Sequence, residues 1–232
     1  SREILRKLSI PGWLMPEIVA PGTIIGVLRE GLAGSVGLNA ARLVAVGSHD
    51  TASAYAAAPV ANPAHALIIS SGTWSLVGKL VKKPITTPEA MRENISNEGG
   101  IGNVRLLKNC MGTWLVQELR RVWRAEDGRE MSWDECCRLA EKAAPFAALI
   151  DPDDPGFYNP PDMQTAIAEF CRRTGQALPA DRGTMLRSIY EGLALKYRMV
   201  GEAVSAASGK PNRVVHIVGG GSKNEMLNQF AA

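Results

Sequence analysis

Residues 43–58 read Leu-Val-Ala-Val-Gly-Ser-His-Asp-Thr-Ala-Ser-Ala-Tyr-Ala-Ala-Ala. The four apolar residues at the start indicate a short strand that ends at Gly47, and the alanine-rich run from Thr51 favours a helix that Pro59 closes. A strand that passes directly into a helix is typical of α/β folds, in which ligands bind at the edge where the strands end. The stretch therefore predicts an α/β protein with a candidate ligand site at residues 47–51.

Asp50 lies at this junction, between His49 and Thr51. A carboxylate in such a place can act as a general base on a substrate hydroxyl, while its two neighbours hydrogen-bond the same substrate. Aspartate is also a common N-cap of helices, which would be a purely structural role. The residues by themselves leave both roles open.

Two glycine turns lie further along the chain. The first, Ser70-Ser71-Gly72-Thr73, joins strands predicted over 66–69 and 74–80, so it predicts a hairpin. Backbone amides and hydroxyls in such a turn can bind a phosphate, although an ordinary hairpin turn has the same pattern.

The second turn, Gly219-Gly220-Gly221, follows a strand predicted over 214–218 and precedes a helix predicted from Glu225. Its glycines let a ligand approach the backbone, and the N-terminus of a helix favours an anion. Asn224 stands where the dinucleotide fingerprint has its third glycine, which argues against a dinucleotide site. Ligand binding and a plain turn both stay open here.

Helical periodicity dominates the middle of the chain. Apolar residues recur every three or four positions over 106–123, which predicts a helix on which Asn109 and Gln117 share one face, lining a cleft or meeting solvent. Ser132 and Glu135 form a capping-box pattern, and further helices are predicted over 162–174 and 185–204. Together with the strands, these helices predict a mixed sheet with flanking helices.

Composition narrows the class of protein. With 46% hydrophobic and 21% charged residues, the 232-residue chain is globular, and its net charge of +3 is spread along the chain rather than gathered in a basic tract. No apolar run approaches the ~18 residues that span a bilayer, so we expect neither a nucleic-acid nor a membrane partner. The four cysteines include no C-x-x-C pair, which argues against a zinc site or a disulfide framework and favours the cytoplasm.

Five strings, taken in order and with their spacing, carry a resemblance to a known family. They are residues 46–54, 70–76, 97–100, 107–109 with 111–112 and 114–115, and 216–221. These strings resemble the FGGY carbohydrate kinases, and the resemblance covers nearly the whole chain. They are most similar to those of members that use Mg-ATP to phosphorylate L-rhamnulose to L-rhamnulose 1-phosphate in rhamnose catabolism.

The resemblance implies an actin-like ATPase (ribonuclease H-like) fold in two domains that close on a cleft. Residues 1–46 are then the tail of the N-terminal sugar-kinase domain, and residues 47–232 are most of the C-terminal nucleotide-binding domain. Because the chain starts at Ser1 and ends a few residues into a predicted helix, we expect it to be incomplete at both ends.

The resemblance also implies the role of each candidate residue. The catalytic base is Asp50. The sugar contacts are His49, Asp50, Thr51 and Asn109, and the ATP contacts are Thr73, Gln117 and Gly220. ATP and Mg²⁺ are the implied cofactors, but the acidic residue that serves Mg²⁺ in the family lies upstream of Ser1, so no metal ligand is expected in this chain. We therefore expect the chain by itself to be inactive.

Two alternatives to this function stay open. One is another FGGY kinase, of the fuculose, xylulose or glycerol type. The other is a non-catalytic, actin-like module that only binds nucleotide. An aspartate at position 50 favours catalysis over the second alternative, because an acceptor hydroxyl needs a group that takes up its proton.

Overall fold

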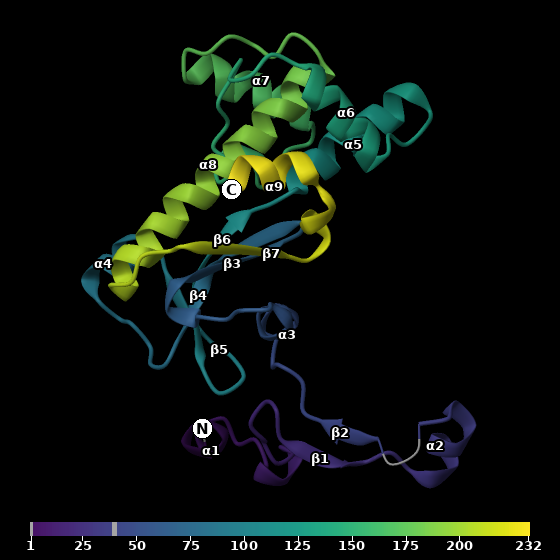
Figure 1. Ribbon diagram of the computed structural model, residues 1–232, viewed down its shortest axis with the longest axis vertical. Helices are drawn as coiled ribbons and strands as arrows, with labels where there is room; N and C mark the ends of the chain where they lie inside the picture. The colour runs from purple at the N-terminus through teal and green to yellow at the C-terminus, as the bar shows by residue number, and fades with distance from the viewer. Residues whose placement is uncertain (1, 39–40) are drawn as a thin grey trace.

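A five-stranded mixed sheet forms the centre of the computed structural model, which describes residues 2–38 and 41–232 (Figure 1). The strands run in the order β5–β6–β4–β3–β7. Their bounds are β3 (Ala66–Ser71), β4 (Trp74–Val81), β5 (Ser96–Gly99), β6 (Val104–Met111) and β7 (Val214–Val218). Neighbouring strands are antiparallel except β3 and β7, which are parallel, so both of these strands end at the same edge of the sheet.

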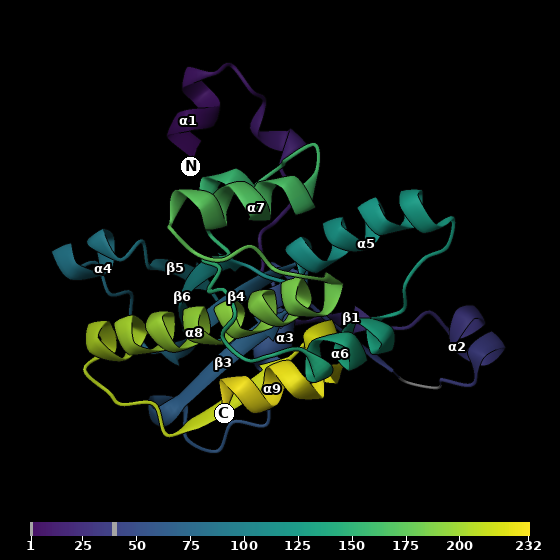
Figure 2. The same cartoon turned by 90° about the horizontal axis from the view of Figure 1, so that it is seen from above.

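One face of the sheet packs against the long helix α8 (Arg182–Ser208), with α9 (Glu225–Ala231) beside it (Figure 2). Three more helices gather at one end of the sheet: α5 (Trp114–Asp127), α6 (Trp133–Lys142) and α7 (Met163–Arg173). A short helix, α4 (Pro88–Arg92), contacts α8. This large core contains Leu67 and Ile69 of β3 together with Leu193 of α8.

The opposite face carries a much smaller core, formed with α3 (Asp50–Ala57). Side chains alternate between the two faces of a strand, so Ile68 points toward α3 while its neighbours belong to the large core. Buried Tyr55 anchors α3, because its hydroxyl donates to the carbonyl oxygens of Ile68 (3.0 Å) and Leu76 (3.1 Å).

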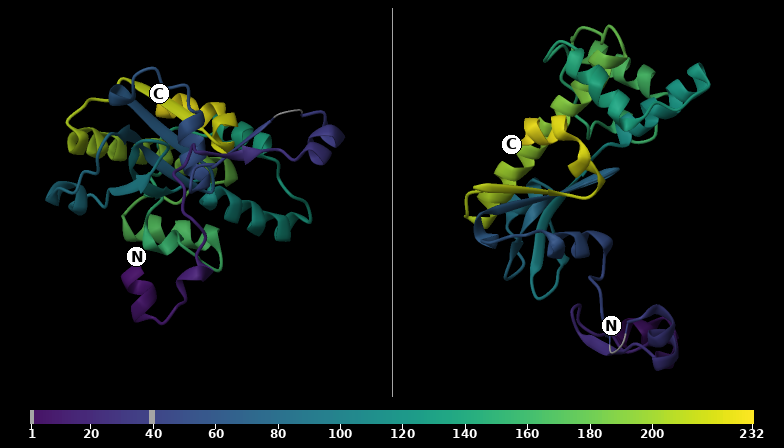
Figure 3. Two further views of the ribbon diagram at one scale, coloured as in Figure 1. Left: turned by 90° about the horizontal axis from the view of Figure 1, so that it is seen from below. Right: turned by 45° about the vertical axis from the view of Figure 1, so that its right-hand side comes forward.

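The N-terminal part of the chain lies apart from this sheet and is connected to α3 (Figures 1 and 3). It contains α1 (Arg2–Lys7), α2 (Glu30–Val36) and a two-stranded antiparallel sheet of β1 (Ile24–Val27) and β2 (Arg42–Val44). Large apolar side chains here are exposed, among them Trp13 (82%) and Ile18 (94%). Whether residue 46 marks a domain boundary stays a prediction.

Several predicted elements are confirmed. The hairpin of β3 and β4, the helix α3, the long helix α8 and the strand β7 all form where they were expected. The capping box at Ser132 and Glu135 is present, with both of its reciprocal hydrogen bonds.

The helix predicted over 106–123 is wrong in its first third. Residues Val104–Met111 form strand β6, and the helix α5 begins only at Trp114. The reason is burial on both faces of the sheet: Leu107 belongs to the small core, whereas Leu106 and Cys110 belong to the large one. A strand covered on both faces loses the alternation of apolar and polar residues that would reveal it.

None of the helices formed by the described residues is both long and apolar enough to cross a membrane.

Candidate functional site

A cavity of about 590 Å³ opens at the edge where β3 and β7 end. Six of the seven predicted site residues line it: His49, Asp50, Thr51, Thr73, Asn109 and Gly220. The seventh, Gln117, reaches the cavity wall through a hydrogen bond from its Nε2 to Thr73 Oγ1 (3.0 Å). Because β3 and β7 are parallel neighbours, the turns that follow them meet, and residues far apart in the sequence share one site.

Gly112 and Thr113, the two residues just before α5, hold the turn between β3 and β4. The amide of Gly112 donates to the carbonyl oxygen of Thr73 (3.0 Å), and the amide and hydroxyl of Thr113 donate to that of Gly72 (2.9 and 3.0 Å). Both carbonyls of the turn are therefore engaged away from the cavity. Gln117, one helical turn after Thr113, is thereby placed beside Thr73, and the two predicted nucleotide contacts lie together.

The glycines around this edge have different roles. At Gly219, φ is +87° and an added Cβ would lie 2.7 Å from the carbonyl oxygen of Ser71. At Gly221 and Gly112, an added Cβ would overlap Ser71 Oγ and the Gly72 carbonyl oxygen, respectively. Only Gly220 has open space where a side chain would begin, with nothing within 4 Å, and it lines the cavity. The fold requires the other three glycines, whereas Gly220 leaves room for a ligand.

Tyr197 of α8 supports the same turn from the large core. Its hydroxyl lies 2.7 Å from Ser75 Oγ and 3.3 Å from Ser71 Oγ, the two facing residues at the end of the hairpin. Burial raises the pKa of Tyr197 above its ordinary value of 10.0, so its hydroxyl stays protonated and keeps this double contact into the alkaline range.

Asp50 is the first residue of α3 rather than its N-cap, so the N-cap position considered for it is wrong. The cap position belongs to His49, whose Nδ1 accepts from the amide of Thr51 (3.3 Å). Asp50 Oδ1 also accepts from that amide (2.7 Å), and its side chain is 89% exposed. Its carboxylate therefore lies in the cavity wall, accessible to a substrate.

Asn109 lies on β6, opposite Leu76 of β4, and Gln117 lies on α5. The predicted shared helix face does not exist. Both residues nevertheless reach one site, because the sheet edge brings the end of β6 and the start of α5 next to the hairpin turn.

Two charged residues of the site were missed by the reasoning from sequence. Arg105 of β6 is 1% exposed, and it donates from Nη2 to Glu98 Oε2 (2.8 Å) and from Nη1 to Thr51 Oγ1 (2.6 Å). Its Nε donates to the carbonyl oxygen of Gly99 (3.0 Å), and its guanidinium lies over the Tyr55 ring. Glu98 itself lines the cavity. Arg105 was missed because a single arginine inside an apolar stretch forms no motif. Glu98 belongs to a string that indicated the family but gave this residue no role in the site.

The described residues do not supply a metal-binding group, since no three His, Cys, Asp or Glu side chains among them converge as metal ligands would. Of the two carboxylates in the cavity wall, Glu98 is paired with Arg105, which leaves Asp50. The residues in this part of the chain therefore do not fit a Mg²⁺ site of their own, and no step below passes through the ion. Mg²⁺ as a cofactor stays a prediction.

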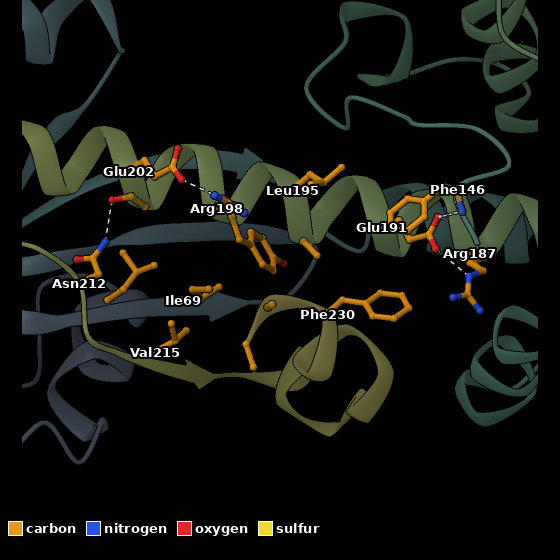
Figure 4. A pocket seen from close by; sticks show the side chains of 16 residues that line it. Ile69, Phe146, Arg187, Glu191, Leu195, Arg198, Glu202, Asn212, Val215 and Phe230 are labelled. Carbon is orange, nitrogen blue, oxygen red and sulfur yellow. Dashed lines mark hydrogen bonds and ion pairs between the residues drawn. The ribbon is translucent and has the colours of Figure 1, made fainter. Parts of the chain in front are cut away.

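A second hollow of about 550 Å³ lies between α8, β7 and α9 (Figure 4). It contains none of the seven predicted residues. Its charged side chains pair with one another, Arg187 with Glu191 (2.8 Å) and Arg198 with Glu202 (2.9 Å). The cavity at the end of β3 and β7 is therefore the candidate site.

Residues 67–232 match the C-terminal domain of the FGGY family of carbohydrate kinases, and the chain belongs to this family. The predicted fold class is confirmed with it, as a mixed α/β domain of the actin-like ATPase fold.

Among curated proteins, the chain is similar to the rhamnulokinase of Bacteroides thetaiotaomicron, with 43% identity over 99% of this chain and 46% of that protein. It is 37% identical to the rhamnulokinase of Bacillus subtilis, over 99% of this chain and 47% of that protein. The chain thus spans about half the length of the curated relatives it matches.

Solved structures of sugar kinases share the fold. A xylulose kinase from Rhodospirillum rubrum superposes with a TM-score of 0.66 at 16% identity, over 100% of this chain and 46% of that one. A gluconate kinase from Lactobacillus acidophilus gives a TM-score of 0.62 at 15% identity, with the same coverage. At these identities the likeness concerns the fold alone.

Proposed function

We propose that this chain carries the catalytic base and the nucleotide-binding side of a kinase that phosphorylates L-rhamnulose to L-rhamnulose 1-phosphate at the expense of ATP. The observation that supports it most is the single cavity that gathers Asp50, the Thr73–Gln117 pair and Gly220. The curated relatives named rhamnulokinase support the choice of sugar. Because the chain spans about half their length, the activity is proposed for it in the context of that full length.

Asp50 is the proposed general base. Its exposed carboxylate takes the proton of the sugar hydroxyl while that oxygen bonds to the γ-phosphorus and the oxygen of ADP departs. His49, Thr51 and Asn109, which line the same cavity, would hold the sugar by hydrogen bonds. The hydroxyl oxygen becomes more positive as it bonds to phosphorus, and this positive charge passes with the proton to the Asp50 carboxylate.

The residues on the other side of the cavity fit a nucleotide. ATP, when bound, supplies the phosphoryl group. Thr73 and Gln117 offer polar groups near a turn whose carbonyls point elsewhere, which suits the oxygens of a phosphate. Gly220 leaves open space at the end of β7, where the adenosine side would lie against the backbone.

A chimera tests this proposal at full length. This chain would replace the region that it matches in the Bacteroides thetaiotaomicron rhamnulokinase, and ADP release would be measured with L-rhamnulose, L-fuculose, D-xylulose and glycerol. We expect turnover with a preference for L-rhamnulose. Preference for another sugar would overturn the substrate, and absence of turnover with all four would favour a module that only binds nucleotide.

The base is tested in the same chimera by Asp50→Asn. The amide keeps the size of the side chain but cannot take up a proton, so kcat should fall by at least ~100-fold. Asp134→Asn is the matched control, since Asp134 is another exposed aspartate in the first turn of a helix, α6. If Asp50→Asn kept the activity of the control, Asp50 would not be the base.

A further inference from the structure

The hydrogen bonds of the site fix which atoms donate around Thr51. The guanidinium of Arg105 has donors only, so Thr51 Oγ1, 2.6 Å from Nη1, must accept. Glu98 takes the second Nη of the same guanidinium at 2.8 Å and compensates its charge in the buried setting. Arg105 is thereby held with one donor directed at Thr51.

The single hydrogen of the Thr51 hydroxyl then points to His49. Thr51 Oγ1 lies 2.6 Å from His49 Nδ1, and since this oxygen accepts from Arg105, its own hydrogen is available for the ring nitrogen. The amide of Thr51 approaches the same nitrogen at 3.3 Å. That amide nitrogen has a single hydrogen and lies closer to Asp50 Oδ1, at 2.7 Å, so the Thr51 hydroxyl is the main donor to Nδ1. With Nδ1 as an acceptor, the proton of the neutral ring belongs on Nε2.

The competing arrangement has a hydrogen on Nδ1, in the neutral Nδ1–H ring or in the protonated ring, and this hydrogen would be donated to Asp50 Oδ1 at 2.9 Å. The Thr51 hydroxyl would then have no acceptor at His49. The protonated ring would also add a second cation close to Arg105. Asp50 Oδ1 has a donor without it, the Thr51 amide at 2.7 Å. The Nε2–H ring gives the Thr51 hydroxyl an acceptor while Asp50 Oδ1 keeps its amide donor, whereas a hydrogen on Nδ1 leaves the hydroxyl without an acceptor at His49.

We propose that Arg105 is a positioning residue that acts through the Thr51 hydroxyl to fix His49 as the Nε2–H tautomer, which makes His49 a hydrogen-bond donor to the sugar. The identity of the ligand rests on the proposed function. Among the described residues, the hydrogen bonds of the His49 ring all involve Nδ1, and the residue lines the cavity. The site then offers a sugar one donor at His49 and one acceptor at Asp50.

The tautomer can be read directly by NMR. The 232-residue chain, labelled with ¹⁵N in its histidine rings, would be examined by long-range ¹H–¹⁵N correlation at about pH 8, where histidine is ordinarily neutral. The chain has only three histidines, so the His49→Gln variant identifies the His49 signals. We expect one protonated nitrogen, Nε2. A ring protonated at Nδ1, or at both nitrogens, would overturn the proposal.

Two variants of Thr51 test the link to Arg105. Thr51→Val keeps the shape of the side chain without its hydroxyl, so we expect a mixture of tautomers at His49, whereas Thr51→Ser should keep Nε2–H. Arg105→Lys retains a cation beside Glu98 but loses the planar fork that serves two acceptors, and should also give a mixture. Unchanged His49 signals in both Thr51→Val and Arg105→Lys would overturn the proposal.

Kinetics of the chimera give a second readout. Thr51→Val should raise the KM for the sugar by about tenfold, more than it lowers kcat, with recovery in Thr51→Ser. An equal loss in both Thr51 variants would contradict the role of the hydroxyl. The NMR result stands whether or not the chimera turns over, so failure of this inference and failure of the proposed kinase activity are distinguishable.

Discussion

The two faces of the five-stranded sheet support the two sides of the candidate site by different means. On the face covered by α8, the hairpin turn and the glycine turn are held by backbone contacts and by Tyr197, within the large core. On the opposite face, α3 rests on a small core, with Tyr55 and Arg105 as its polar anchors.

The difference shows how each side tolerates change. The nucleotide side is defined by main-chain packing, in which a single added methyl group meets backbone atoms. Substitutions there should therefore lower the stability of the fold. The base side is defined by a few hydrogen-bonded side chains. Substitutions of these side chains should therefore displace His49, Asp50 and Thr51 while most of the domain stays folded.

The largest effect should come from Gly112→Ala. The added Cβ would overlap the Gly72 carbonyl and lie 2.8 Å from Ser75 Oγ, so we expect a loss of about 3 kcal/mol of unfolding free energy, measured by urea denaturation. Gly72→Ala is the control, because the nearest atom to its Cβ would be the Trp74 carbonyl oxygen at 3.6 Å. Equal losses in the two variants would mean that close packing does not define this turn.

A pair of tyrosine variants compares the two faces directly. Tyr55→Phe removes the donor for the Ile68 and Leu76 carbonyls and should cost about 2 kcal/mol. In native-state hydrogen exchange, the amides of α3 should exchange faster than the global loss explains, because the helix loses its anchor to the sheet. Tyr197→Phe should instead affect the sheet and α8 together. If the amides of α3 exchange selectively faster in neither variant, the two faces of the sheet do not differ in this way and the comparison fails.

Alkaline pH should weaken the large core first. Burial raises the pKa of Cys110 to about 12 and that of Cys136 to about 11, and both thiols lie in that core. In the unfolded chain such thiols ionise near the usual value of 9.0, so their contribution is complete below that pH and is lost as the pH rises toward the folded values. The urea midpoint should therefore fall above about pH 9.

Cys110→Ala should make this decline shallower, by up to about 1 kcal/mol per pH unit, even though the small cavity lowers stability at pH 7. A decline with the same slope in Cys110→Ala would place the titrating groups elsewhere.

Gly220→Ala should have the smallest effect on the fold. Nothing lies within 4 Å of the added Cβ, so stability should change by less than ~0.5 kcal/mol, while ADP binding to the chain, followed by calorimetry, should weaken by about tenfold. Gly34→Ala is the control, since that glycine of α2 also has nothing within 4 Å. Unchanged ADP affinity in Gly220→Ala would remove Gly220 from the proposed nucleotide site.

Much of the fold could be predicted because its signals are local. The hairpin follows from Gly72 between two apolar runs, and the start of α6 from the capping box at Ser132. Strand β6 could not be predicted, because it is buried by both cores and its apolar positions imitate a helix. Strand β5 went unrecognised as well: it carries Ser96, Asn97 and Glu98, and only pairing with β6 makes it a strand.

That Asp50, Thr73 and Gly220 lie in one site could be predicted from their strings and the resemblance, and they do line one cavity, while their roles stay predictions. Asn109 and Gln117 were assigned to one site for a wrong geometric reason, a shared helix, and only the resemblance gave them their separate contacts. Arg105 and Glu98 could not be predicted, because Arg105 contacts Thr51 and pairs with Glu98 only after β5, β6 and α3 have come together in the folded domain.

The parallel pairing of β3 with β7 has a consequence for how the chain folds. The two strands are far apart in the sequence, Ala66 pairing with Val214, and contacts so distant along the chain form slowly. During synthesis, β3 and β4 leave the ribosome long before β7, and in that interval one edge of β3 has unpaired N–H and C=O groups that can recruit another strand. Strand β7, which emerges long after β3, therefore both completes the glycine turn of the cavity and covers this edge of β3.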